Sequence, residues 1–279
     1  MTSSRARLLR RGILVAIVLI LIVIYLFPVY WMVSTSFKVE KDYFSWPPKW
    51  LPNPLTLEHY RVLFGPRNML FYFRNSLIIS VTSVALCLVS GSLASYALAK
   101  FRFQGNVGKN VAMWILSLRM MPPIAVAIPI FILFGKMHLI DTQLGLILAY
   151  VFFNLPFVVW MMYGFFAEIP PEVEEAGMVD GCGRFGVFWR IAVPLAAPGL
   201  AATAIFAMVM SWNEFLFASK LTAFNANTMP VLISSFITDR GLLWGEMSAA
   251  GTIASLPMVV MSLFVQRYLV RGLTLGAVK

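Results

Sequence analysis

Long apolar runs dominate the chain, and shorter polar stretches separate them. Six runs are long enough to cross a bilayer, since a helix needs about 20 apolar residues to span about 30 Å of hydrocarbon. They cover residues 13–35, 76–98, 111–134, 143–165, 196–217 and 250–270. Lipid offers the backbone no hydrogen-bond partners, so each run is expected to form a helix. The pattern predicts an all-α membrane protein, with one domain of six transmembrane helices over residues 13–270.

Prolines interrupt two of the predicted helices. The third contains Pro122, Pro123 and Pro129, and the fourth contains Pro156. Each proline removes a backbone hydrogen bond and favours a kink, which a membrane tolerates where neighbouring helices or a lined cavity take up the freed carbonyls. Pro129 fits the ordinary abundance of proline in membrane helices. For the run Met120-Met121-Pro122-Pro123, that interpretation and a broken helix beside a transport pathway both remain open.

Composition and charge agree with a membrane protein and give it an orientation. The chain is 60% hydrophobic and 12% charged, and its mean hydropathy is +0.82, whereas soluble domains are about 25% charged. With the amino terminus inside, twelve Lys and Arg residues fall on the cytoplasmic side and nine outside, six of them in loop 36–75. The positive-inside rule therefore places both termini, 1–12 and 271–279, in the cytoplasm.

Catalytic and metal-binding patterns are not found in the sequence. Cys87 and Cys182 fall in different predicted regions, and His59 and His138 have no partners at metal-ligand spacing. No phosphate loop, nucleophile elbow or HExxH motif is present. The net charge of +10 suits orientation and contact with anionic lipid headgroups, and no basic-aromatic array indicates nucleic acid. We expect neither an enzyme nor a bound metal.

The loop 166–195 is unusually acidic for a connection between two apolar runs. Residues 172–179 read as a short helix that begins at Pro170-Pro171 and carries carboxylates in its first turn, where the helix dipole favours them. Gly181 and Gly183 permit a tight reversal. A second helical piece is predicted from Arg184 to Val193, ending at Pro194. The loop is expected to form a helix-turn-helix on the cytoplasmic membrane surface; the alternative is an ordinary amphipathic connector.

The spacing in this loop resembles the Glu-Ala-Ala loop of the membrane subunits of binding-protein-dependent ABC importers. The residues that carry the match are Glu174, Glu175, Ala176, Gly177, Asp180, Gly181, Ile191 and Pro194. Gly177 stands where that family usually has Ala, which lowers helix propensity by about 1 kcal/mol and is interpreted as allowing closer approach of an ATPase. Val193 stands where the family usually has Leu.

Further segments carry the same resemblance, specifically to the carbohydrate branch of the maltose-transporter type. They extend over nearly the whole chain: residues 75–76, 98–103, 211–215 and 272–279. The resemblance implies a type I ABC importer permease fold, with the 166–195 loop as a coupling helix that docks on an ATPase. It also implies that the carboxyl-terminal tail contacts the ATPase dimer.

The resemblance implies a set of partners and no cofactor in this chain. The partners are a second homologous permease subunit, two ATPase subunits that bind ATP and Mg²⁺, and a periplasmic or lipid-anchored sugar-binding protein. Membrane lipids surround the chain, and the expected location is the inner cell membrane. The missing phosphate loop agrees, because the nucleotide must then be bound by another polypeptide. A secondary transporter without an ATPase is the less favoured alternative.

Five residues are candidates for the translocation pathway: Arg119, Asn154, Trp212, Asn213 and Glu214. Arg119 is the one charge well inside a predicted span, about 12 Å from its start, and a charge at that depth is a functional-site hypothesis. Alternatively, it is a structural cation that bonds the carbonyls freed by the prolines. Trp212 also fits an interfacial aromatic belt, with Glu214 exposed.

The scarcity of charges in the spans predicts an uncharged substrate. Asn154, aromatic faces and the Ser and Thr residues of the spans supply the few polar groups that a sugar site uses. A translocated anion would need more cations along the pathway, because a lone charge at membrane depth is costly. The competing hypothesis is glycerol 3-phosphate or another sugar phosphate, whose charge Arg119 would meet.

Overall fold

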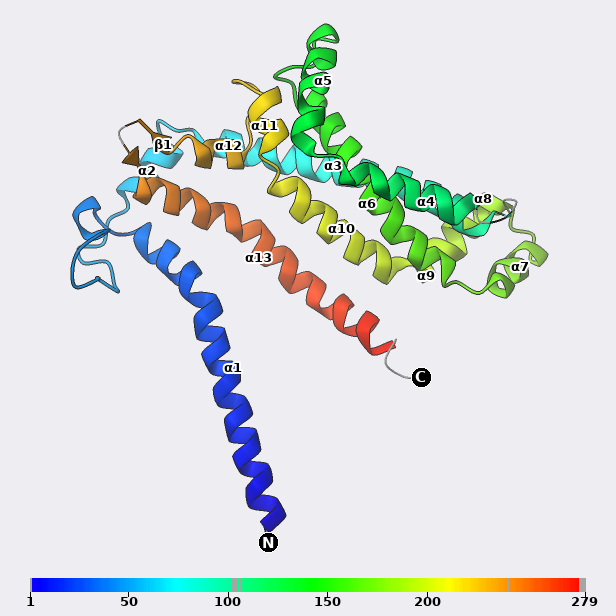
Figure 1. Ribbon diagram of the computed structural model, residues 1–279, viewed down its shortest axis with the longest axis horizontal. Helices are drawn as coiled ribbons and strands as arrows, with labels where there is room; N and C mark the ends of the chain where they lie inside the picture. The colour runs from blue at the N-terminus through cyan, green and yellow to red at the C-terminus, as the bar shows by residue number, and fades with distance from the viewer. Residues whose placement is uncertain (1, 102–104, 106, 240, 276–279) are drawn as a thin grey trace. The chain divides into compact units, whose positions relative to one another are not determined.

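The computed structural model describes residues 2–101, 105, 107–239 and 241–275, and they are almost entirely helical (Figure 1). The chain divides into two compact units: residues up to Met69 together with 233–255, and residues 70–232 together with those from Leu256 onward. We describe each unit separately. The predicted all-α fold is confirmed for the described residues, apart from a two-stranded hairpin.

The first unit contains a long apolar helix and a folded loop region. Its elements are α1 (Thr2–Thr35), the 3-10 turn η1 (Glu40–Asp42), α2 (Glu58–Phe64), strands β1 (Ile237–Thr238) and β2 (Gly241–Leu242), and the start of α13 (Trp244–Leu275). The strands pair antiparallel, with Ile237 opposite Leu242. From Arg10 onward α1 has a hydropathy of 3.1, and none of that window is buried inside the protein.

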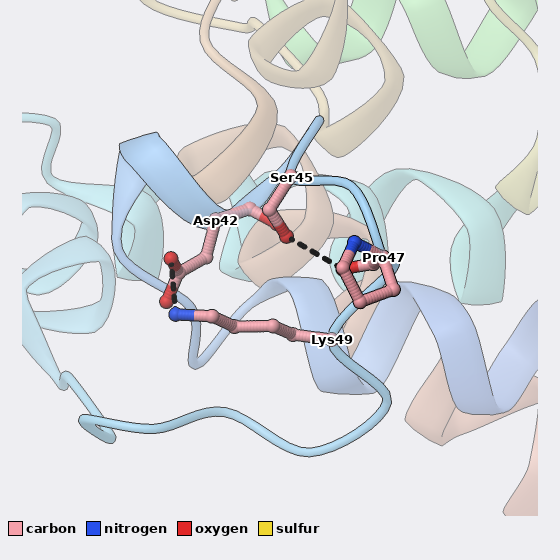
Figure 2. A network of polar contacts seen from close by, with 4 residues as sticks. All are labelled: Asp42, Ser45, Pro47 and Lys49. Carbon is pink, nitrogen blue, oxygen red and sulfur yellow. Dashed lines mark hydrogen bonds and ion pairs between the residues drawn. The ribbon is translucent and has the colours of Figure 1, made fainter.

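Polar contacts hold the loop after α1 in a defined shape. Lys49 forms an ion pair of 2.7 Å with the buried carboxylate of Asp42, and the Ser45 hydroxyl donates to the carbonyls of Asp42 and Pro47 (Figure 2). Lys38 is fully buried, and its Nζ lies 3.8 Å from the centroid of the Trp31 ring. Burial lowers the pKa of Lys38, while Asp42 opposes that effect. The loop is therefore an ordered surface.

The second unit is a helical bundle. Its elements are α3 (Met69–Lys100), α4 (Val107–Ser117), η2 (Leu118–Met120), α5 (Pro123–Lys136), α6 (Gln143–Ala167), α7 (Pro171–Val179), α8 (Arg184–Val187), the π-helical turn η3 (Phe188–Ala192), α9 (Val193–Leu195), α10 (Ala197–Trp212), α11 (Leu216–Leu221), α12 (Met229–Ser234) and the rest of α13. Helix α6 packs against both α4 and α10 (Figure 1). Most of the core lies among α3, α6, η3 and α10.

A bend interrupts one of the six predicted spans, and a second bend lies at the start of another. Among the described residues, four helices are long and apolar enough to cross a membrane: α1, α3, α6 and α13. The predicted span 111–134 is bent by 88° between η2 and α5, and the helices on either side of Ala196 meet at 76°. Pro122 explains the first bend, because it has no N–H and restricts the residue before it. Each bent pair counts as one crossing or none, so the number six stays a prediction.

Asp141 stabilises the connection after α11 through its carboxylate. Its Oδ1 accepts hydrogen bonds from the backbone N–H groups of Ala223, Phe224, Asn225 and Ala226, at 2.8 to 3.3 Å. Burial acts to raise the pKa of Asp141, but these four donors together lower it below its ordinary value of 3.8. The stabilisation is therefore present above the ordinary pKa and is lost as the pH falls through the lowered one.

We predict that Asp141→Ala destabilises the protein by about 2–3 kcal/mol, because hydrogen bonds to a charged acceptor contribute about 1.5–3 kcal/mol. Asp141→Asn keeps one acceptor oxygen and is expected to cost less. The midpoint of thermal unfolding in detergent measures the effect. The control is Glu168→Ala, which removes an exposed carboxylate that forms no ion pair with another described residue. Equal midpoints for Asp141→Ala and the control would contradict the role of Asp141.

Candidate functional site

The acidic loop begins with the predicted short helix. Helix α7 starts at Pro171 after the extended residue Pro170, and carries Glu172 and Glu174 in its first turn. Its end is capped by backbone hydrogen bonds from Gly181 to Met178 (3.1 Å) and from residue 182 to Gly177 (3.0 Å). Gly181 has a φ of +89°, a left-handed conformation that glycine adopts without a steric penalty. The tight reversal predicted at Gly181 is therefore present.

The second helical piece extends one residue past its predicted end at Pro194, to Leu195. Helix α8 continues through the π-helical turn η3 into α9, and the break falls at Ala196. Pro194 lies inside this continuous stretch, shortly after η3, and its missing N–H cannot complete an α-helical hydrogen bond there. The π-helical turn η3 ends two residues before Pro194. Such turns are frequent at functional sites. The apolar sequence gave no signal for that change in hydrogen-bond register.

Helix α7 packs directly against η3 at a glycine. Gly177 is buried, and a Cβ added there would collide with the Cδ1 atom of Ile191. The sequence interpretation, in which Gly177 lets an ATPase approach more closely, is therefore wrong. The absent side chain makes room for Ile191 within this chain. Gly177 and Ile191 thus fix the angle between the two arms of the loop.

A second contact ties the loop to the end of α3. The Lys100 ammonium donates to the carbonyl of Ile169 at 2.5 Å and lies 3.6 Å from Oε1 of Glu174. The two side chains are only 10% and 11% exposed. Burial raises the pKa of Glu174, and Lys100 partly offsets the shift. The sequence indicated only a topological role for Lys100, because a pair 74 positions apart has no local signature.

A cavity of about 690 Å³ lies beside this contact. Its lining combines apolar and charged side chains, among them Tyr96, Lys100, Glu174, Glu175 and Arg184. Beneath it, the ring of Tyr96 packs 5.5 Å from Phe166 and 5.0 Å from Phe188, measured between centroids. This aromatic cluster joins α3, α6 and η3. The loop is therefore attached to the bundle by an apolar contact and a polar one.

The rest of α7 and its turn faces outward at one end of the second unit (Figure 1). Glu175, Ala176, Asp180 and Gly181 are exposed, and Val179 is 87% exposed. Glu174 and Gly177 are buried, so the eight residues of the sequence match divide into an exposed set and a set that packs the loop. An exposed apolar and acidic ridge on a rigid support is suited to contact another protein.

Arg119 lies at the sharp bend between α4 and α5, in η2. Its Nη2 donates to the sulfur of Met210 at 3.0 Å, and its guanidinium carbon lies 5.0 Å from the centroid of the Phe157 ring. The expected alternative was a bond to carbonyls freed by Pro122 and Pro123, and the guanidinium instead contacts a sulfur and an aromatic face. No ion pair between Arg119 and another described residue is present.

Asn154 and Trp212 are buried parts of the bundle. The Asn154 amide donates to the Ser211 hydroxyl at 2.9 Å, and that hydroxyl lies 3.5 Å from Ser83, so α3, α6 and α10 are linked. Trp212 is 3% exposed and packs edge-on against Phe73 at 5.6 Å. The aromatic-belt alternative for Trp212 is therefore wrong, because a belt residue would face the membrane interface.

Glu214 and Asn213 differ in their hydrogen bonds and in their exposure. Glu214 accepts hydrogen bonds from the N–H groups of Phe217 (2.9 Å) and Ala218 (3.1 Å), so it caps the start of α11. The alternative that left Glu214 exposed at the interface is wrong for this reason. Asn213 is exposed, and its amide donates to the carbonyl of Val209 at 2.8 Å. The five pathway candidates thus do not form one cluster of free polar groups.

Comparison with known proteins gives a family for this arrangement. Residues 69–275 match the sequence profile of the binding-protein-dependent transport system inner membrane component. The permease of a diacetylchitobiose uptake system from Streptomyces coelicolor is 37% identical over 256 residues, 91% of each chain. The permease of a trehalose/maltose transport system from Thermococcus litoralis is 35% identical over 285 residues, 99% of each chain.

The fold also has a solved counterpart. A chain of a bacterial ABC transporter involved in the import of the acidic polysaccharide alginate superposes with a TM-score of 0.76 at 22% identity, covering 92% of this chain and 95% of that one. Within the described residues, no group of three or more His, Cys, Asp or Glu side chains is arranged to hold a metal ion. By its sequence and its fold, the chain belongs to the family of membrane-spanning permease components of binding-protein-dependent ABC transporters.

Proposed function

We propose that this chain is the permease subunit of an ATP-driven importer for a sugar, an oligosaccharide or a polyol. Its spans form part of an alternating-access pathway, and its 166–195 loop passes force from an ATPase to that pathway. The observation that carries the proposal is the exposed ridge of α7, which is held rigidly on the bundle by Gly177 and Lys100. The sugar class follows from the diacetylchitobiose and trehalose/maltose permeases to which the chain is similar.

The partners in this proposal supply what the chain lacks. Two ATPase subunits bind ATP and Mg²⁺, since the sequence contains no phosphate loop. A second homologous permease subunit completes the pathway, and a periplasmic or lipid-anchored sugar-binding protein delivers the substrate from outside. Within α7, we assign contact with the ATPase to the exposed residues Glu175, Ala176, Asp180 and Gly181. Glu174, Gly177 and Ile191 hold the ridge in place, and we assign no contact to Pro194, which is exposed.

The proposed orientation places both termini and the 166–195 loop in the cytoplasm and loop 36–75 outside. Support comes from the distribution of Lys and Arg in the flanks of the spans. In that orientation the exposed ridge of α7 faces the cytoplasm, where the ATPase subunits bind ATP, and the ordered loop that Asp42 and Lys49 stabilise faces the delivery protein. The transmembrane domain then covers residues 13–270, between the tails 1–12 and 271–279.

The five pathway candidates differ in exposure and in the contacts they make. Arg119 and Asn213 retain exposed surface, whereas Asn154, Trp212 and Glu214 act as supports behind the pathway. We propose an uncharged substrate, because the guanidinium of Arg119 already contacts the sulfur of Met210 and the ring of Phe157. A sugar phosphate is the second candidate, and the absence of an ion-pair partner for Arg119 among the described residues is what favours it.

The orientation predicts which positions an impermeant thiol reagent reaches. In a variant with Cys87 and Cys182 replaced by Ser, single cysteines replace the exposed residues Asn53 and Glu172. Intact cells with a permeabilised outer membrane are expected to label at position 53 and not at 172, and lysis is expected to expose position 172. The cysteine-free variant is the control. Labelling at 172 before lysis, without labelling at 53, would contradict the orientation.

The coupling role predicts that Gly181→Arg and Glu175→Lys leave the chain inserted but lower binding-protein-stimulated ATP hydrolysis by about tenfold, a change of about 1.4 kcal/mol. Gly181→Arg adds bulk to the exposed turn and strains its left-handed backbone, and Glu175→Lys reverses a charge on the ridge. The assay uses the assembled complex in proteoliposomes and measures copurification of the ATPase alongside hydrolysis.

Two further variants separate backbone strain from side-chain bulk at position 181, and a charge on the ridge from a charge outside it. Gly181→Ala introduces the backbone strain without the bulk and is expected to give an intermediate loss. Glu168→Lys reverses an exposed charge just outside α7 and is expected to behave like the wild type. Normal stimulation in both Gly181→Arg and Glu175→Lys would remove the exposed ridge of α7 from the coupling mechanism.

A further inference from the structure

The carboxyl-terminal end of α3 is joined to α7 by a buried ionic contact. Lys100 is the last residue of α3, and its ammonium contacts the Ile169 carbonyl, which precedes α7, and the Glu174 carboxylate within α7. We call these three groups the clamp. One ammonium therefore connects the end of α3 to two neighbouring groups of the loop, which are distant from it in sequence. Within the described residues, the pair Lys100–Glu174 is the polar contact between α3 and α7.

The clamp is costly to break because its charged side chains are largely buried, with one side of the pair lining the cavity. Both charged side chains are about nine-tenths buried, and removing one partner would leave the other charge without compensation. Lys100 also lies where the helix dipole of α3 favours a cation. These terms make α3 and α7 energetically dependent on each other.

Helix α7 has one other route into the bundle. Gly177 contacts Ile191 of η3, and η3 continues through α9 toward α10. Motion of α7 thus reaches α10 through the chain itself. Helix α3 is not a neighbour of α7 in sequence, so the two are linked through space, by the clamp, by the packing of Tyr96 on Phe188 and by the contact of Arg184 with the Phe101 ring just after α3.

We propose that the Lys100–Ile169–Glu174 clamp makes α3 move together with α7, so that a displacement of α7 by the ATPase is passed to α3 as well as to α10. This inference rests on the proposed function of α7 as the coupling helix. Lys100 and Glu174 are positioning residues in this scheme. The distance of 3.6 Å between their charged atoms exceeds that of a hydrogen bond, and the adjoining cavity of about 690 Å³ leaves the pair room to adjust during the stroke.

The test measures the distance between α3 and α7 in the assembled complex. Spin labels are attached to cysteines at the exposed positions Val89 and Glu172 in the background without native cysteines. The distance distribution is recorded without nucleotide and after trapping with ATP and vanadate. In the wild type, we expect the two distributions to coincide. In Lys100→Gln, we expect the trapped distance to shift by more than the width of the wild-type distribution.

Hydrolysis gives a second readout on the same samples. Lys100→Gln is expected to retain ATP hydrolysis but to lose about tenfold of its stimulation by the binding protein, a coupling loss of about 1.4 kcal/mol. Lys100→Arg keeps the charge and the donors, so it is expected to behave like the wild type. Lys109→Gln is the matched control, since Lys109 is exposed and forms no ion pair with another described residue.

Glu174→Asp keeps the inference testable if Lys100→Gln fails to assemble. It preserves both charges but withdraws the carboxylate from Lys100, so it is expected to assemble and still to lengthen the trapped distance. An unchanged distance in Glu174→Asp or in an assembled Lys100→Gln, with stimulation equal to that of Lys109→Gln, would overturn the clamp. A wild-type complex without any binding-protein-stimulated hydrolysis would instead contradict the proposed function itself.

Discussion

The structure depends on how the chain satisfies polar groups where its helices break. A continuous membrane helix satisfies its own backbone, but a bend or an end leaves carbonyl and N–H groups that lipid cannot solvate. This protein satisfies several such groups with single charged side chains. Asp141 gathers four N–H groups after α11, Glu214 caps the start of α11, and Lys100 binds the carbonyl of Ile169 before α7. Each of these side chains places an irregular segment in one position on the regular bundle.

Contacts of this kind also make the 166–195 loop rigid, as the proposed coupling role requires. A loop that is free to swing would absorb a push from a partner, whereas α7 is held by a glycine contact, an aromatic cluster and an ion pair. Its exposed face presents Glu175, Asp180 and apolar side chains such as Val179. Contacts that fix the loop and residues that face a partner thus belong to opposite sides of one short helix. The alternation of buried Glu174 and exposed Glu175 follows from the helical period.

The start of α7 and the reversal after it were predictable from the sequence, because single residues determine them. Pro170 and Pro171 marked the start of α7, and Gly181 marked the reversal after it, because proline and glycine act on the backbone at their own positions. The apolar runs located the long helices, because a backbone in lipid must satisfy its own hydrogen bonds. The family resemblance, carried by the spacing from Glu174 to Pro194, was confirmed by the relatives and the fold.

Contacts between distant segments were not predictable from one sequence. Gly177 was assigned to a partner's approach, although it faces Ile191, which only the folded loop brings near it. The pairing of Lys100 with Glu174 and the burial of Trp212 against Phe73 have the same origin. The π turn η3 was not predicted either, because periodicity assumes a constant hydrogen-bond register.

The most direct measurement is uptake into proteoliposomes that contain the permease pair, the ATPase and the binding protein. Labelled neutral oligosaccharides and phosphorylated sugars would be offered outside, with ATP enclosed and with ionophores present to collapse ion gradients. The account predicts uptake of a neutral sugar that requires ATP hydrolysis, resists the ionophores and persists in Arg119→Gln. Uptake that runs without the ATPase and stops with the ionophores would contradict it. So would uptake confined to phosphorylated sugars and abolished in Arg119→Gln.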